Sequence, residues 1–125
     1  MDKKRILLVD DEPSVTRMLQ MYLEATGAYE VWAENDSKQA LAAAQAFRPD
    51  VIILDLVMPG KDGAAVADEI STDAALKGVP IIFLTALVTE KEVGREGRDI
   101  GGYSFLAKPI DPEKVVECIE KNVKS

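Results

Sequence analysis

The stretch "VIILDLVMPGKDG", residues 51–63, joins four branched apolar residues to a lone carboxylate and then to a Pro-Gly turn. A run this apolar is typical of a strand that is buried on both faces of a parallel sheet. An ionised carboxylate costs several kcal/mol in such surroundings unless its charge is compensated. Asp55 therefore either lies just beyond the strand as a turn residue or faces a site that uses its charge.

Size and composition narrow the class of protein. The 125 residues suit one compact domain, which we expect to span residues 1–125, and 47% apolar residues are enough for a core. A net charge of −7 argues against nucleic-acid binding by the whole surface. The single cysteine excludes an internal disulfide, and the lack of histidine excludes His-dependent triads and metal sites. With no membrane-length apolar run and no signal-peptide pattern, we expect a cytoplasmic protein.

Apolar runs alternate with amphipathic stretches along the whole chain. We expect strands over residues 5–9, 29–34, 51–54, 81–85 and 103–107. Helical spacing predicts one helix from Pro13 to Gly27, a second capped by Ser37, a third over residues 64–75 and a last one from residue 111. Strands that alternate with helices predict an α/β fold, a doubly wound parallel sheet with helices on both faces.

The stretch between the fourth and fifth expected strands is less regular. It opens with a capping box from Thr89 to Glu92 but contains Gly94 and Gly97, each costing about 1 kcal/mol in a helix interior. We therefore expect a short or labile fourth helix.

Polar residues stand at the ends of four expected strands. Asp10 and Asp11 follow the first, Asp55 the third, Thr85 ends the fourth and Lys108 follows the fifth. Ligands of doubly wound sheets bind at the carboxyl ends of the strands. If the first and third strands are neighbours, three carboxylates converge there and repel one another unless a cation is present. Oxygen ligands without His or Cys suit Mg²⁺, and the lysine and hydroxyl suit phosphoryl oxygens.

Each of these residues also has a plain structural interpretation. An Asp after a strand is usually a turn or a helix cap, and the Asp10-Asp11 pair precedes a helix start at Pro13. Thr85 could cap a helix, and Lys108 could be solvated surface. Their joint order around one crevice favours the site. We assign no chemistry to Glu34 and Asn35 at the end of the second strand.

Four motifs in this order, "LLVDDE", "ILDLVMPGKDG", "FLTA" and "FLAKP", make the chain resemble the receiver domain of bacterial two-component response regulators over essentially its whole length. The resemblance implies a flavodoxin-like sheet with strand order 2-1-3-4-5. It also implies that Asp55 accepts a phosphoryl group from a phosphohistidine of a sensor kinase. Mg²⁺ would be bound by Asp10, Asp11, Asp55 and the backbone carbonyl of Val57.

The same resemblance assigns roles around the phosphoryl group. Lys108 and Thr85 would hold its oxygens, and the bond from Lys108 to Pro109 would be cis. Movement of Thr85 on phosphorylation would let Phe105 turn inward, although Phe105 as a plain core residue is an equally good interpretation. Apolar residues at positions 57 and 87 suit slow self-dephosphorylation.

Competing functions and partners follow from these residues. A dehalogenase-type phosphatase would need an acid two residues after the nucleophile, where Val57 stands. A flavin- or nucleotide-binding module would need a Gly-rich loop after the first strand, where "DDEP" stands. An inactive pseudo-receiver would lack part of the intact residue set. We expect a protein that catalyses only its own phosphorylation and dephosphorylation, and so is not a turnover enzyme.

The expected partners are a sensor histidine kinase or phosphotransfer protein, together with a downstream protein target or an effector domain outside this chain. We expect no direct nucleic-acid or membrane contact, and a phosphorylation-dependent dimer is compatible with the sequence.

Overall fold

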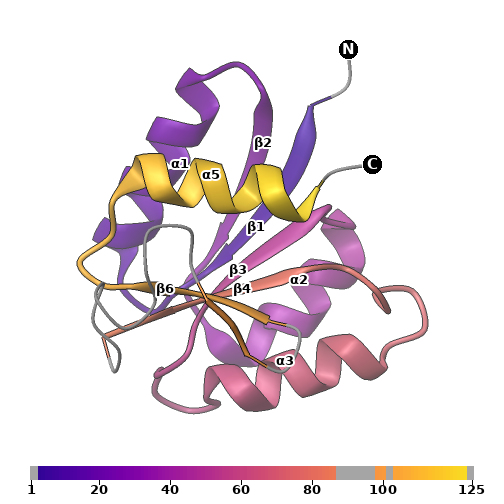
Figure 1. Ribbon diagram of the computed structural model, residues 1–125. Coiled ribbons are helices and arrows are strands. Elements are labelled where there is room, and N and C mark those ends of the chain that lie inside the picture. The colour runs from indigo at the N-terminus through magenta and orange to yellow at the C-terminus, as the bar shows by residue number, and fades with distance from the viewer. Residues whose placement is uncertain (1–2, 87–97, 101–102, 124–125) are drawn as a thin grey trace.

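The computed structural model describes residues 3–86, 98–100 and 103–123, and its strands and helices alternate from the N-terminus as far as Thr85 (Figure 1). The strands are β1 (Lys4–Val9), β2 (Tyr29–Glu34), β3 (Val51–Asp55), β4 (Ile81–Thr85), β5 (Arg98–Ile100) and β6 (Tyr103–Ala107). The helices are α1 (Pro13–Ala25), α2 (Ala40–Phe47), α3 (Gly63–Thr72) and α5 (Pro112–Asn122), with a 3₁₀ turn at Ser37–Gln39.

The strands form one sheet in the order β2-β1-β3-β4-β6-β5. The first five in this order are parallel, which confirms the predicted order 2-1-3-4-5. The edge strand β5 was not predicted, and it pairs antiparallel with β6 through Ile100 and Tyr103. Three residues are too few to show a strand pattern, so this pairing depends on a neighbour that local sequence does not reveal. The expected helix start at Thr89 to Glu92 lies outside the described residues.

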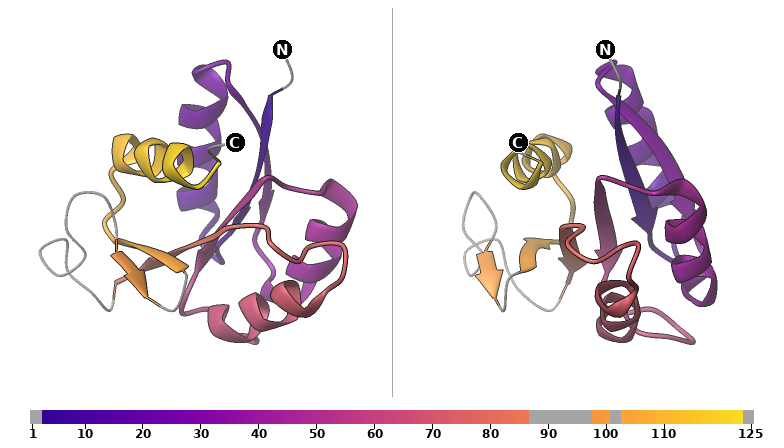
Figure 2. Two further views of the ribbon diagram at one scale, coloured as in Figure 1. Left: turned by 45° about the vertical axis from the view of Figure 1, so that its right-hand side comes forward. Right: turned by 90° about the vertical axis from the view of Figure 1, so that its right-hand side faces the viewer.

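Helices cover both faces of the sheet, as predicted (Figure 2). Two apolar cores lie between the sheet and these helices. Side chains of successive strand residues point to opposite faces, so neighbouring β3 residues enter different cores. Ile52 and Leu54 pack in the core with α2 and α3, whereas Val51 and Ile53 pack in the core with α1 and α5. Every residue of β3 is buried, as its apolar run predicted.

The ends of two helices differ from the prediction. Asp36, rather than Ser37, caps the 3₁₀ turn before α2, because its carboxylate accepts the Lys38 amide at 3.0 Å. Helix α3 ends earlier than expected, at Thr72, and it also begins one residue earlier, at Gly63. The Asp62 carboxylate caps this start by accepting the Ala65 amide at 2.8 Å. In both places an aspartate supplies the cap that satisfies a free amide of the first turn.

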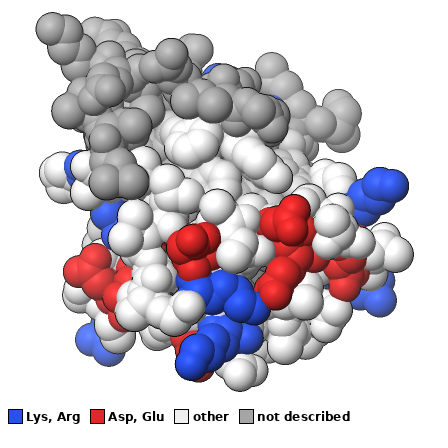
Figure 3. All heavy atoms as spheres, turned by 90° about the horizontal axis from the view of Figure 1, so that it is seen from below, with Lys and Arg blue, Asp and Glu red and all other residues white. Residues whose placement is uncertain are grey.

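The surface facing down in Figure 1 carries acidic and basic side chains next to one another (Figure 3). Among the described residues, no helix has both the length and the apolar character that crossing a membrane requires.

Candidate functional site

Three carboxylates meet at the carboxyl end of the sheet. Asp10 directly follows β1, and Asp55 is the last residue of the neighbouring strand β3. One carboxylate oxygen from each of Asp10, Asp11 and Asp55 lies within 4.8 Å of the others. Asp10 and Asp55 are buried, with 1% and 4% of their surface exposed, and Asp11 is half-buried. The strand order therefore brings together residues that are about forty-five positions apart, which is why no local pattern shows their contact.

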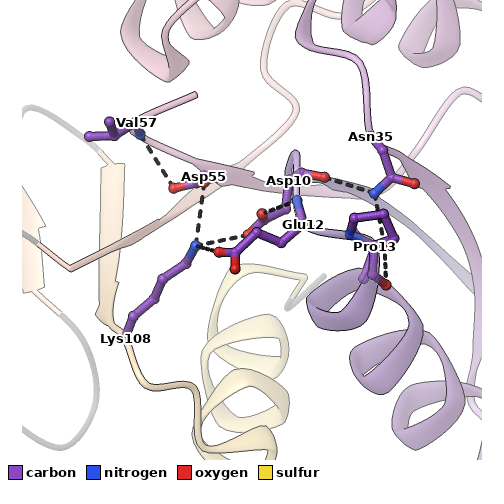
Figure 4. Close-up of polar contacts among 8 residues, drawn as sticks. Asp10, Glu12, Pro13, Asn35, Asp55, Val57 and Lys108 are labelled. Atoms are coloured by element: carbon purple, nitrogen blue, oxygen red, sulfur yellow. Dashed lines mark hydrogen bonds and ion pairs between the residues drawn. The ribbon is translucent and has the colours of Figure 1, made fainter. Parts of the chain in front are cut away.

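Lys108 is the cation of this acidic group, which we call the acid pocket (Asp10, Asp11 and Asp55). Its ammonium nitrogen lies 3.0 Å from Asp10 Oδ2 and 3.3 Å from Asp55 Oδ2. The close-up shows the side chain reaching between the two carboxylates, with Glu12 Oε1 3.4 Å away (Figure 4). The Lys108 amide donates to the Thr85 carbonyl at 2.9 Å, and the bond from Lys108 to Pro109 is cis.

The charges of this pocket change its titration. Burial raises the pKa of Asp55, and the neighbouring Asp10 charge raises it further, while Lys108 and the Val57 amide partly oppose the shift. Burial by itself would lower the pKa of Lys108, but contacts with Asp10 and Asp55 outweigh it, so the pKa of Lys108 is raised. The lysine is therefore held charged among carboxylates that it does not fully neutralise.

The acid pocket fits a hard divalent cation. Asp10 Oδ2 is buried and makes no hydrogen bond to the described residues, although it is within ion-pair distance of Lys108. Such a buried oxygen is costly without a further partner. Three carboxylates against one ammonium leave a net negative charge, and an all-oxygen donor set is the kind that Mg²⁺ prefers.

An open hollow of about 330 Å³ leads to this pocket, with Asp55, Asp11 and Lys108 in its lining. Val57 and Ala86 form part of the rim. Val57 is 60% exposed, and its amide donates to Asp55 Oδ1 at 3.3 Å. A ligand in this hollow can therefore reach the Asp55 carboxylate from solvent.

Thr85 and Phe105 lie on the neighbouring strands. Thr85 is buried at the end of β4 and pairs with Ala107 of β6. Phe105 is half-buried, and its ring stacks on Phe83 with centroids 5.1 Å apart, on the side of the sheet that faces α2 and α3. Thr85 thus ends β4, next to the β3 strand that ends in Asp55, and Phe105 lies on β6 two residues before Ala107, the partner of Thr85.

Two residues with no predicted role also contact the site. Asn35 donates from its amide nitrogen to the Asp10 carbonyl at 2.8 Å and to Thr16 Oγ1 at 3.0 Å (Figure 4). Glu12 contacts Lys108, and its amide donates to Asp10 Oδ1 at 2.9 Å. Asn35 stands at the end of β2, and its place among the polar strand ends was the only signal that could have identified it.

Comparisons with known proteins agree with this architecture. A family model described as the response regulator receiver domain matches residues 6–120. The DNA-binding response regulator MtrA of Mycolicibacterium smegmatis is 34% identical over 122 residues, which cover 98% of this chain and 51% of that protein. Response regulator Rre1 of Synechocystis is 35% identical over 123 residues, covering 94% of this chain and 50% of that protein. The chain spans about half the length of the curated relatives it matches.

Solved structures show the same fold. The chemotaxis protein CheY4 of Vibrio cholerae has a TM-score of 0.82 and 32% identity, covering 96% of this chain and 98% of that chain. The receiver domain of a sensor histidine kinase from Pseudomonas aeruginosa PAO1 has a TM-score of 0.81 and 30% identity, covering 99% and 100%. That structure has a magnesium ion coordinated in its active site cleft. Together with the acid pocket, these matches show that the chain belongs to the family of response regulator receiver domains of two-component systems.

Proposed function

We propose that Asp55 accepts a phosphoryl group from a phosphohistidine of a sensor histidine kinase or of a phosphotransfer protein, in a Mg²⁺-dependent reaction. One observation carries this proposal. The buried Asp55 carboxylate lies within 4.8 Å of the Asp10 and Asp11 oxygens and 3.3 Å from the Lys108 ammonium, at a hollow open to solvent. Such a pocket combines a nucleophile, ligands for a cation and a positive charge for phosphoryl oxygens.

The transfer exchanges one bond for another. A carboxylate oxygen of Asp55 forms a bond to phosphorus, and the bond from phosphorus to the donor's imidazole nitrogen breaks, which leaves an acyl phosphate. Asp10, Asp11, Asp55 and the backbone carbonyl of Val57 would hold Mg²⁺, which when bound neutralises charge on the phosphoryl oxygens. Lys108 would turn from the carboxylates to one phosphoryl oxygen, because its flexible stem carries three donors.

Phosphorylation would then change the face around β4 and β6. The new phosphoryl oxygens would attract the Thr85 hydroxyl, and Phe105 would move with it. A hollow of about 310 Å³, lined by Phe105 together with Phe83 and Tyr103, supports this part of the proposal because it offers room for a ring to move. The signal would pass to a downstream protein or to an effector domain in the same protein.

The proposed setting follows from the family. The chain would work in the cytoplasm, without contacting nucleic acid or membrane directly, and phosphorylation would favour a dimer. Its own relatives include DNA-binding response regulators, so a DNA-binding effector is one candidate output.

A phosphatase is the less favoured function. Position 57, where that class needs an acid, holds an apolar residue that is 60% exposed at the rim of the hollow. Without that acid, water attack on the acyl phosphate lacks a general base at this position. We therefore propose that the chain catalyses only its own phosphorylation and dephosphorylation.

Incubation with acetyl phosphate and Mg²⁺, followed by intact-protein mass spectrometry, tests the proposal. One phosphoryl adduct is expected on the wild-type chain and none on Asp55→Asn or in the presence of EDTA. Asp68→Asn, which changes an exposed acid of α3, is the matched control and should be modified like the wild type. An adduct that persists on Asp55→Asn would show that another residue is the acceptor.

A further inference from the structure

The connection between β2 and α2 contacts the two loops that follow β1 and β3 at the acid pocket. Asn35, at its start, holds the β1–α1 loop, because its side-chain amide donates to the Asp10 carbonyl at 2.8 Å. The backbone adds to this contact, since the Asp10 amide donates to the Glu34 carbonyl at 3.2 Å. The end of β2 therefore holds both the backbone amide and the backbone carbonyl of Asp10.

Ser37 holds the second loop, residues 56–62 between β3 and α3. Its hydroxyl donates to the Pro59 carbonyl at 3.1 Å and accepts the Lys61 amide at 3.2 Å. Ser37 is 4% exposed, so this hydroxyl satisfies two backbone groups away from water. A Cβ on Gly60 would lie only 3.2 Å from Lys38 Cε and 3.5 Å from Ser37 Oγ, which shows how closely the two segments pack.

We propose that Asn35 and Ser37 are positioning residues that hold the two ligand-bearing loops in register for the divalent cation. Neither side chain needs to touch the cation. Asn35 fixes the backbone beside the Asp10 carboxylate, and Ser37 fixes the loop that contains Val57 two residues after Asp55. Loops already held in the binding geometry lose less conformational freedom when a cation binds, so they bind it more tightly.

This inference rests on the proposed Mg²⁺ site, and it adds two residues that influence the affinity of that site without binding the ion. The two residues are separated by one position, so one short segment controls both loops. A change in this segment would alter the distance between Asp10 and the carbonyl of Val57 without changing any acidic residue.

Isothermal titration of chelator-treated protein with Mg²⁺ tests the proposal directly. Removal of groups that orient metal ligands typically weakens affinity by about tenfold or more, and for the more remote Ser37→Ala and Asn35→Ala we expect about three- to tenfold. Ser71→Ala is the matched control, because it removes an exposed hydroxyl that bonds the Asp68 carbonyl within α3. Its Mg²⁺ affinity should equal that of the wild type.

Two further readouts separate positioning from a general loss of stability. In acetyl phosphate reactions, Ser37→Ala should need more Mg²⁺ for half-maximal rate yet reach the wild-type rate at saturating Mg²⁺. In metal-free protein, the Lys61 amide should exchange faster in Ser37→Ala than in Ser71→Ala. Ser37→Cys keeps the volume of the side chain with a weaker hydrogen bond and should shift the affinity in the same direction.

Wild-type affinity in Ser37→Ala, Ser37→Cys and Asn35→Ala would overturn the positioning role while leaving the Mg²⁺ site intact. Failure of the wild-type chain itself to bind Mg²⁺ would overturn the proposed metal site and this inference with it. If both Ser37 variants failed to unfold cooperatively, Asn35→Ala, a change at an exposed residue, would provide the same comparison on the β1–α1 loop.

Discussion

Replacing Asp55 by Asn should stabilise the protein in the absence of divalent cations. At an effective dielectric constant of about 20, like charges 4.8 Å apart, the upper limit for the three carboxylate oxygens, repel by about 3.5 kcal/mol. Opposite charges 3.3 Å apart attract by about 5 kcal/mol. Asp55 has like charges at Asp10 and Asp11 against one attraction to Lys108, which leaves about 2 kcal/mol of net repulsion. Burial, the largest cause of the raised pKa of Asp55, adds to the cost of the ionised carboxylate. Because Asp11 is partly exposed, solvent screening lowers the expected gain in unfolding free energy to about 1–2 kcal/mol.

The gain should depend on pH in a defined direction. Burial and then Asp10 raise the pKa of Asp55 above its ordinary value of 3.8. An acid whose pKa is raised by folding destabilises the folded state at pH values above that raised pKa, where it is ionised. Below 3.8 it is neutral in both states and costs nothing. The advantage of Asp55→Asn should therefore be complete at pH values above the raised pKa and shrink as the pH falls through it towards 3.8.

Urea denaturation followed by circular dichroism measures this difference, first in EDTA and then in Mg²⁺. Mg²⁺ at about a hundred times its dissociation constant would add about 2.7 kcal/mol to the wild-type chain, and much less to Asp55→Asn because a ligand is lost. The exposed control Asp68→Asn should change the unfolding free energy by less than about 0.5 kcal/mol. An Asp55→Asn chain no more stable than the wild type in EDTA at pH 7 would refute the electrostatic reasoning.

Three more perturbations test other parts of the structure. Gly63→Ala would place a Cβ against the Asp55 carbonyl oxygen, so the unfolding free energy of this variant should fall by about 1–3 kcal/mol. Gly27→Ala has open space for its Cβ but a φ of +80°, so its unfolding free energy should fall by about 1 kcal/mol. Lys108→Gln should be less stable than the wild type at pH 7 in EDTA. Because the pKa of Lys108 is raised, the difference in unfolding free energy should narrow only as the pH rises above 10.5. A difference that stays constant above pH 10.5 would argue against the ion pairs. Ile53→Ala removes a side chain that is 1% exposed in the core beneath α1 and α5, and its urea midpoint should reflect a loss of about 2–5 kcal/mol.

The alternation of apolar runs and amphipathic stretches was enough to predict the sheet, its parallel strands and its helices on both faces. The buried run before Asp55 was informative because both faces of such a strand need cover, and helices on both faces of a doubly wound sheet supply that cover. Strand β5 was missed because Arg98–Ile100 pairs with β6 through backbone groups, which leave no side-chain pattern in three residues.

The acid pocket was predictable in outline, since the carboxyl ends of parallel strands gather at one edge of the sheet. The contacts that hold it were not. Ser37 was expected to cap a helix, but Asp36 is the cap, and the Ser37 hydroxyl bonds two backbone groups more than twenty positions away. Asn35 likewise bonds a carbonyl on another strand end. Side-chain hydrogen bonds to distant backbone depend on the folded geometry, so apart from the place of Asn35 at a strand end no sequence pattern indicated them.

A crystal structure of the protein soaked in Mn²⁺, with anomalous data collected for the metal, tests the central claim most directly. Mn²⁺ takes the same oxygen ligands as Mg²⁺ and is visible by its anomalous signal. One strong anomalous peak is expected among the carboxylates of Asp10, Asp11 and Asp55. An empty pocket at saturating Mn²⁺, or a peak elsewhere with Lys108 still paired to both Asp10 and Asp55, would contradict that claim.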